Sequence, residues 1–206
     1  MLIYCPTEDE NERKADMNDK ISSAAFKCRG LFWTLFAIGF LIYPGSFSTA
    51  RYCAGFVLVV AGQLLRFWAA GYIPQYRTEV IGAPELITSG PYSYVRNPLY
   101  AGNFIMGFGW ALMAGFGWLT AFCAAFFLLY CVVIIPAEEK FLEGKFGEKY
   151  TAYKEKTGAL IPLSFPKTAE QDKKFDFKAA WACERYSIRT HVIVTVLLTA
   201  RLLFFR

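Results

Sequence analysis

The sequence predicts an all-α integral membrane protein with about five transmembrane helices. Of its 206 residues, 55% are apolar and 18% are aromatic, which is more apolar than an ordinary soluble domain. Residues 30–50 and 98–137 carry no charged side chain, and residues 52–76 carry only Arg66. About 20 apolar residues cross a bilayer as a helix, and a helix bonds its own backbone groups internally. The length fits one domain.

The first two spans are expected at about residues 25–43 and 52–71, after a polar segment over residues 1–24. The sequence "YPGS" at the end of the first span is a strong turn signal. In the second span, Gly55 and Gly62 suit the close approach of another helix. Arg66 has two interpretations: its side chain extends to the membrane surface, or it faces a polar cavity.

A helical hairpin is expected next, with spans at about residues 99–114 and 118–135 and a turn at "AGFGW". Pro136 is expected to end or kink the second of these helices. Leu142, Phe146, Tyr150 and Tyr153 recur at helical spacing, which predicts an amphipathic helix over residues 139–156. These elements form a membrane core over residues 25–163. In the C-terminal segment 164–206, a short fifth span is expected at about residues 189–205.

The positive charges predict the orientation. The first 29 residues carry five lysines and arginines, and residues 140–189 carry eleven. Because cytoplasmic loops are enriched in these residues, the N-terminus, the 73–98 loop and the 138–189 region are expected in the cytoplasm. The net charge of +5 therefore reflects topology, and no nucleic-acid partner is expected.

The first candidate for chemistry is the turn over residues 84–103. Pro91 and Pro98 restrict the backbone, and a helix that begins at Pro98 has free N–H groups that suit a carboxylate or a phosphate. Arg96 adds a planar set of donors. The aromatic faces of Tyr92, Tyr94 and Tyr100 suit a flat ring such as adenine. The alternative is a membrane-entry turn with an aromatic belt and an arginine that binds lipid headgroups.

The second candidate is the adjacent pair Glu138 and Glu139, just after the hairpin. Neighbouring helical residues point about 100° apart, so one carboxylate can face inward while the other faces solvent. Two ordinary solvated charges at a helix exit are the alternative. The hairpin topology places both candidates at its cytoplasmic end. Donors and acceptors at one interface fit a zwitterionic ligand.

Other chemistry has little support. The cysteines at positions 5, 28, 53, 123, 131 and 183 lack the pair spacing of a metal site, and they are interpreted as reduced or buried thiols. The only histidine, His191, is interpreted as a packed or interfacial residue. The chain has no GxGxxG after a strand, no Walker A sequence, no HExxH and no GxSxG. No metal is therefore expected.

Two motifs carry a resemblance to a known family. "LITSGPYSYVRNPLYAG" and, after an uncharged hairpin, "EEKFLEGKFGEKYTAYKEKTGALIP" resemble isoprenylcysteine carboxyl methyltransferases and their phospholipid methyltransferase relatives. The resemblance covers roughly residues 52–163. It implies a multi-span membrane enzyme that uses S-adenosyl-L-methionine and releases S-adenosyl-L-homocysteine.

The resemblance also implies which residues hold the cofactor. The implied contacts are Leu86, Ile87, Tyr92, Asn97, Pro98, Leu99, Tyr100 and Glu138. This chain departs from the family at two positions: Asn97 replaces the usual histidine, and Ile134 replaces the arginine that eukaryotic isoprenylcysteine enzymes carry one turn before the glutamate.

The sequence therefore predicts methyl transfer to a lipophilic acceptor that enters from the bilayer, with a cofactor pocket on the cytoplasmic side. The acceptor is a carboxylate of an isoprenylcysteine-like compound or a lipid headgroup. Arg96 is expected to anchor an anionic group, and Glu139 to act as base for an amine acceptor. The alternatives are an NADPH-dependent membrane reductase of the sterol-reductase type, and a non-catalytic membrane protein that binds lipid or a partner. No obligate protein partner is expected.

Overall fold

The computed structural model describes residues 30–43, 45, 47–73, 85–163 and 173–204, and these residues are helical apart from short connections. The polar segment 1–24 and the start of the first expected span lie outside the described residues. An apolar helix covers Gly30–Ile42. It is followed by α2 (Thr49–Ala70), η2 (Gly90–Ser93), α3 (Pro98–Ala114), α4 (Phe116–Phe126), η3 (Phe127–Ile134), α5 (Ile135–Phe146), α6 (Glu148–Lys156) and α7 (Phe177–Phe204).

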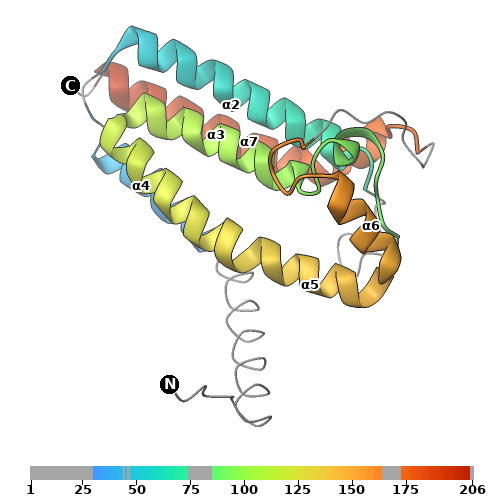
Figure 1. Cartoon of the computed structure of the whole chain (residues 1–206). Helices are drawn as coiled ribbons and strands as arrows, with labels where there is room; N and C mark the ends of the chain where they lie inside the picture. The colour runs from blue at the N-terminus through green and yellow to red at the C-terminus, as the bar shows by residue number, and fades with distance from the viewer. Residues whose placement is uncertain (1–29, 44, 46, 74–84, 164–172, 205–206) are drawn as a thin grey trace, which may run out of the picture.

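Three helices in the described residues are long and apolar enough to cross a membrane: Thr49–Ala70, Phe116–Phe146 and Phe177–Phe204. The prediction of an all-α integral membrane protein is therefore confirmed, while the count of five spans stays a prediction. Helices α2, α3 and α7 lie side by side, and α4 leads into α5 along the other side of the molecule (Figure 1). At one end, α6 lies beside the segment that precedes α3.

Glycines let α2 and α3 approach closely. A Cβ atom built on Gly55 would lie 2.5 Å from the carbonyl oxygen of Gly109, and one built on Gly62 would lie 2.7 Å from that of Gly102. Such distances exclude a side chain at these positions. Small residues are common where membrane helices pack together. Within a bilayer the hydrophobic effect does little to bring helices together, so their association depends on close contact between the backbones. This contact fixes α3, and therefore the start of α3, against α2.

Of the two alternatives expected for Pro136, an end of the helix is wrong, because the helical path continues past it, while a kink stays a prediction. The segment Phe127–Ile134 is a π-helix, and Ile135 N donates to the carbonyl of Tyr130, five residues earlier. This change of hydrogen-bond register places Pro136 in the first turn of α5, where a missing N–H is tolerated. The helical path therefore continues to Phe146.

The expectation of one amphipathic helix over residues 139–156 is also wrong. Helix α5 ends at Phe146 and α6 begins at Glu148. Gly147 between them has φ +54°, a left-handed conformation that glycine adopts without a steric penalty. The chain turns at this glycine, and α6 returns toward the segment before α3.

Helix α7 starts earlier than the expected 189–205 span. It begins at Phe177 and has 28 residues. Asp176 caps its start, because the carboxylate oxygen Oδ1 accepts hydrogen bonds from Lys178 N at 2.8 Å and Ala179 N at 3.1 Å. Asp176 N in turn donates to Gly71 O at 2.9 Å. The start of α7 is thereby joined to the end of α2.

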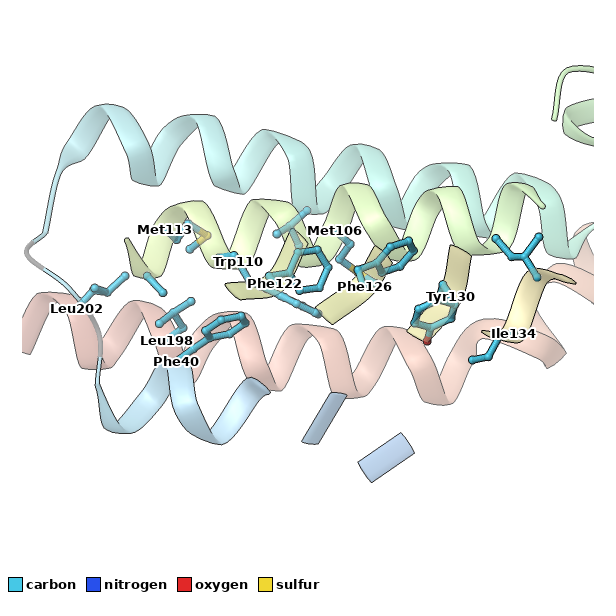
Figure 2. Packing of buried hydrophobic residues seen from close by; sticks show 14 residues of the cluster. Phe40, Met106, Trp110, Met113, Phe122, Phe126, Tyr130, Ile134, Leu198 and Leu202 are labelled. Carbon is cyan, nitrogen blue, oxygen red and sulfur yellow. The ribbon is translucent and has the colours of Figure 1, made fainter. Parts of the chain in front are cut away.

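An aromatic core connects the first helix with the hairpin. The rings of Phe126 and Tyr130 stack at 4.4 Å, and Trp33 Nε1 donates a 2.7 Å hydrogen bond to the Tyr130 hydroxyl. Phe122, Phe126 and Tyr130 follow one another along this cluster in Figure 2. The cluster reaches Tyr100 near the start of α3. The ring of Tyr100 lies 5.1 Å from that of Tyr130.

Candidate functional site

The segment before α3 is a compact turn. Gly90 has φ +60°, and a Cβ atom there would lie 2.4 Å from the ring of Tyr72, so only glycine fits. Pro91 occupies the first turn of η2 and is buried. The Ser93 hydroxyl donates a 2.6 Å hydrogen bond to Gly90 O. The glycine and the proline therefore hold the bend that the sequence predicts.

This turn is bonded to the chain that leaves α6. Arg96 N donates to Gly158 O at 2.8 Å, and Asn97 N donates to Ala159 O at 3.1 Å. The Asn97 side chain also donates to Ala159 O, at 3.2 Å. Two motifs that lie apart in the sequence are thus joined by backbone hydrogen bonds. Asn97 donates to the protein itself from its side chain, a role that a neutral histidine can also fill with its single N–H.

Arg96 and Glu139, the two residues predicted to be catalytic, form an ion pair. Arg96 Nε and Nη2 donate to Glu139 Oε1 at 2.9 and 2.7 Å. Both side chains are about one-tenth exposed. Arg96 Nη1 donates to the carbonyls of Lys154, at 3.0 Å, and Thr157. The guanidinium therefore ties α5 and the end of α6 to the bend.

Lys154 completes this charge cluster. Its Nζ lies 3.0 Å from Glu139 Oε2 and 2.7 Å from Glu143 Oε1. The hydrogen bond to Glu143, followed by the one to Glu139, raises the pKa of Lys154. Burial, with a smaller contribution from Glu139, raises the pKa of nearby Tyr150 to about 12.

Tyr153 links α6 to the turn. Its hydroxyl donates a 2.6 Å hydrogen bond to Tyr92 O. Burial, followed by the neighbouring Tyr150, raises the pKa of Tyr153. The phenol therefore stays a donor throughout the neutral range.

Tyr100 and Glu138 form the second contact between the two motifs. The Tyr100 hydroxyl donates to Glu138 Oε1 at 2.6 Å. Asn97 makes no side-chain cap on α3, and Ala101 N bonds to Asn97 O. The N–H groups of Leu99 and Tyr100 precede this first intrahelical bond, so they have no acceptor within the helix. A carboxylate and the N-terminal end of a helix therefore lie at the same end of the hairpin.

The other predicted site residues are less closely joined. Leu86 and Ile87 are half-buried in an irregular stretch that leads into the turn, and Pro98 is buried at the start of α3. The ring of Tyr94 lies against Trp68 of α2, with centroids 6.2 Å apart. Tyr94 thus faces α2, whereas the ring of Tyr100 lies against Tyr130 of η3.

Sequence reasoning missed the partner of Arg66. Its Nη2 donates to Glu184 Oε1 at 2.7 Å, and its Nε donates to Glu184 Oε2 at 3.1 Å. Glu184 of α7 is fully buried, and Arg66 is about one-tenth exposed. Arg66 Nη1 also donates to Asn103 of α3. Of the two interpretations left open, Arg66 thus faces a polar interior.

His191 belongs to the edge of this network. Its Nδ1 lies 2.6 Å from Gln63 Oε1, and its ring lies 5.4 Å from that of Trp110 in an edge-on arrangement. Gln63 Nε2 donates to Glu184 at 3.5 Å. In sequence, the signal for this network was Glu184, the only acidic residue between positions 177 and 204. Such a charge within an apolar helix calls for a partner.

Residues 50–149 match the phospholipid methyltransferase family. The chain is also 33% identical over 115 residues to the nickel-cobalt-cadmium resistance protein NccN of Alcaligenes xylosoxydans xylosoxydans, covering 56% of this chain and 51% of that protein. It is 32% identical over 103 residues to the steroid 5-alpha-reductase DET2 of Solanum lycopersicum, covering 48% of this chain and 38% of that protein.

A fourth similarity is to the protein-S-isoprenylcysteine O-methyltransferase of Schizosaccharomyces pombe, which is 31% identical over 107 residues, covering 50% of this chain and 45% of that protein. The matched stretch is about half the length of these relatives or less. No solved structure matches the chain significantly. The family resemblance seen in the two motifs is therefore confirmed: residues 50–149 match the phospholipid methyltransferase family, and the chain is similar to an isoprenylcysteine methyltransferase.

Proposed function

We propose that this protein transfers a methyl group from S-adenosyl-L-methionine to a lipophilic acceptor at the cytoplasmic face of a membrane. The observation that carries the proposal is the meeting of the two family motifs. Tyr100 bonds to Glu138, and Arg96 bonds to Glu139. The two contacts bring donors, aromatic rings and carboxylates to one end of the α3–α4 hairpin.

The residues present fit the cofactor. The start of α3 suits its carboxylate, because the N-terminal end of a helix favours negative charge. The carboxylate of Glu138 suits its positive part, and the tyrosines offer aromatic faces for the adenine. The residues that would hold it are Leu86, Ile87, Tyr92, Asn97, Pro98, Leu99, Tyr100 and Glu138.

The cofactor, when bound, supplies an electrophilic methyl group on a positively charged sulfur. The protein therefore has to align the acceptor with that group and exclude water. The Arg96–Glu139 pair serves this purpose by holding the bend against α5 and α6. Four of the five N–H donors of Arg96 are used within the protein. The fifth is the donor we assign to an anionic group of the acceptor or the cofactor.

Glu139 is proposed as the base only for an amine acceptor. Its two oxygens already bond to Arg96 and Lys154, so proton transfer to it would weaken the bend. An acceptor that is a carboxylate needs no base. The contacts of Glu139 therefore favour a carboxylate acceptor over an amine.

In this proposal the lipophilic acceptor enters the site from the lipid bilayer. Ile134, where eukaryotic isoprenylcysteine enzymes carry an arginine, is fully buried in the apolar cluster. Its surroundings support an acceptor whose recognition does not depend on a cation at that position. The lipidated carboxylate and the lipid headgroup both stay candidates for the acceptor.

A second candidate function is reduction with NADPH. The similarity to the steroid 5-alpha-reductase of Solanum lycopersicum favours it. A reductase site has to hold the additional phosphate of NADPH. A methyltransferase site has to hold a sulfonium, for which Glu138 is suited.

The two functions are separated by ligand binding to the purified protein in detergent. We expect saturable thermal stabilisation by S-adenosyl-L-homocysteine and none by NADPH. Glu138→Ala should abolish the stabilisation, whereas Glu148→Ala, which removes an exposed carboxylate from α6, should retain it. Stabilisation by NADPH alone would establish the reductase, and a response to neither nucleotide would favour a non-catalytic lipid-binding protein. A labelled methyl donor offered with prenylated cysteines, fatty acids and amine-headgroup lipids then identifies the acceptor.

A further inference from the structure

The exposed face of the first half of α7 carries an arginine pair around a tyrosine. Arg185 and Arg189 are one helical turn apart and both are exposed. The Arg185 guanidinium lies 4.7 Å from the centre of the Tyr186 ring, and that of Arg189 lies 5.9 Å from it. Trp181, one turn earlier on the same face, is 51% exposed. This group is called the Arg185–Arg189 clamp below.

The clamp has no carboxylate partner among the described residues. Glu184 is the only acidic residue of α7, and it points to the opposite face, where it binds Arg66 in the interior. In the part of the chain that the structure describes, the contacts of Arg185 and Arg189 are those to Tyr186. Two cations thus stand together on an exposed surface without neutralisation.

The same face continues as an apolar stripe toward the C-terminal end of α7. Four apolar side chains on this face are about half exposed or more: Val192 (55%), Ile193 (57%), Val196 (59%) and Leu197 (48%). These residues lie in the span that is apolar enough to cross a membrane. A ligand that follows this face therefore meets two arginines first and an uninterrupted hydrocarbon surface next. A phospholipid has its groups in the same order, with a charged phosphate followed by hydrocarbon chains. A soluble anion would contact the arginines but not the apolar stripe.

We propose that the Arg185–Arg189 clamp binds the phosphate of an anionic phospholipid, whose acyl chains lie along the stripe from Val192 to Leu197. A guanidinium offers two parallel donors to a phosphate. Stacking on Tyr186 holds the guanidinium groups near the helix surface, so less side-chain freedom is lost on binding. The clamp lies in the first half of α7, which starts at the end joined to α2 through Asp176 and Gly71. The candidate site lies toward that same end of the helices (Figure 1).

This site is independent of methyl transfer and is tested by lipid binding. Purified protein in a neutral detergent is titrated with short-chain phosphatidylglycerol and, separately, with phosphatidylcholine of the same chain length, and bound lipid is counted by native mass spectrometry. Each arginine near a membrane surface contributes roughly 5-fold in affinity for anionic lipid. Arg185→Gln with Arg189→Gln should therefore weaken phosphatidylglycerol binding roughly 30-fold and leave phosphatidylcholine binding unchanged.

Matched variants distinguish a built site from general charge attraction. Lys145→Gln with Lys149→Gln removes two exposed charges from α5 and α6 and should change phosphatidylglycerol binding less than 2-fold. Arg185→Lys with Arg189→Lys keeps the charge and loses the planar donors, so it should give an intermediate affinity. The proposal is overturned if Arg185→Gln with Arg189→Gln binds phosphatidylglycerol like the unmodified protein. It is also overturned if Lys145→Gln with Lys149→Gln loses as much affinity for phosphatidylglycerol as the glutamine variant of the clamp. An unchanged affinity for phosphatidylcholine shows that the variants are folded.

Discussion

Tyr100 and Glu138, 38 residues apart in the chain, meet at one end of the α3–α4 hairpin, where the tyrosine hydroxyl donates a 2.6 Å hydrogen bond to the carboxylate. A hydrogen bond to a charged group is stronger than one between neutral groups. This contact lies at the start of α3, where the ring of Tyr100 is 5.1 Å from that of Tyr130. It is the point at which we propose that both motifs contact one ligand.

Removing the Tyr100 hydroxyl should weaken cofactor binding without unfolding the protein. Hydrogen bonds to charged groups contribute about 1.5–3 kcal/mol, so Tyr100→Phe should reduce the affinity for S-adenosyl-L-homocysteine roughly 10-fold or more. Asn97→Ala should also reduce it. Calorimetry on the purified protein measures both effects. Tyr43→Phe, at a 75% exposed side chain, serves as the control. If Tyr100→Phe and Asn97→Ala bind like the unmodified protein, the proposed cofactor site is wrong.

The meeting of these motifs was predictable from sequence, and the reason is topological. An uncharged run long enough for two helices has to return to the side it left, so Arg96 and Glu139 share one end. Their pairing was not predictable. The further bonds of Arg96 to Lys154 and Thr157 follow from Gly147, which ends α5 and lets α6 return to the bend, and the residue type alone does not say whether a helix breaks there.

The π-helix and the Arg66–Glu184 pair escaped prediction for other reasons. The residues Phe127–Ile134 are as compatible with an α-helix as with a π-helix, because the difference is one of hydrogen-bond register. Arg66 and Glu184 are 118 residues apart, and their contact requires α7 to dock against α2. Sequence reasoning identified Arg66 as unusual, since a charge in an apolar span needs a partner, and left the partner open.

The Arg96–Glu139 pair should stabilise the fold of the bend. Both side chains are largely buried, so a variant that removes one partner leaves the other charge without compensation, at a cost of about 3–5 kcal/mol. Arg96→Gln and Glu139→Gln should each lower the melting temperature in detergent. The double variant should lose less than the sum of the two. Additive losses, measured by differential scanning fluorimetry, would show that the two residues do not interact.

The Arg66–Glu184 pair should hold α7 in place. Glu184→Gln leaves the guanidinium of Arg66 among α2, α3 and α7 without its carboxylate, so unfolding should become easier by about 3–5 kcal/mol. Arg185→Gln changes the adjacent, exposed residue and should change stability by less than about 0.5 kcal/mol. Thermal unfolding of the two variants in the same detergent gives the comparison. Equal melting temperatures would mean that α7 does not depend on this ion pair.

Stability should fall at high pH because of Tyr150. Its pKa is raised from 10.0 to about 12 by burial first and by Glu139 second. A group whose pKa is higher in the folded state contributes stability that is fully present below the unfolded value and is lost as pH rises toward the folded value. The loss is therefore expected between pH 10 and about 12. Lys154, whose pKa is also raised, adds to the loss in the same direction. Tyr150→Phe should make the decline shallower in melting curves across this range, and an unchanged slope would contradict the assignment.

The glycine contact between α2 and α3 should be intolerant of a single methyl group. A Cβ atom on Gly62 would lie 2.7 Å from both Gly102 O and Met106 N, and one on Gly109 would lie 2.5 Å from Gly55 O. These neighbours are backbone atoms of the facing helix, which cannot turn away as a side chain can, so the helices have to separate. Gly62→Ala and Gly109→Ala should each destabilise the protein by about 1–3 kcal/mol. They should also weaken binding of S-adenosyl-L-homocysteine, because the start of α3 moves with the helix.

Gly144→Ala is the matched control for these two variants. A Cβ atom at Gly144 meets nothing within 4 Å, and the residue lies inside α5. Alanine is favoured over glycine in a helix interior by about 1 kcal/mol, so this substitution should leave stability unchanged or raise it. Melting temperatures of the three variants test the contact directly. If Gly62→Ala and Gly109→Ala have the same melting temperature as Gly144→Ala, α2 and α3 do not touch through their glycines. The start of α3 must then be held by the Arg96–Glu139 pair and by the hydrogen bonds to Gly158 and Ala159.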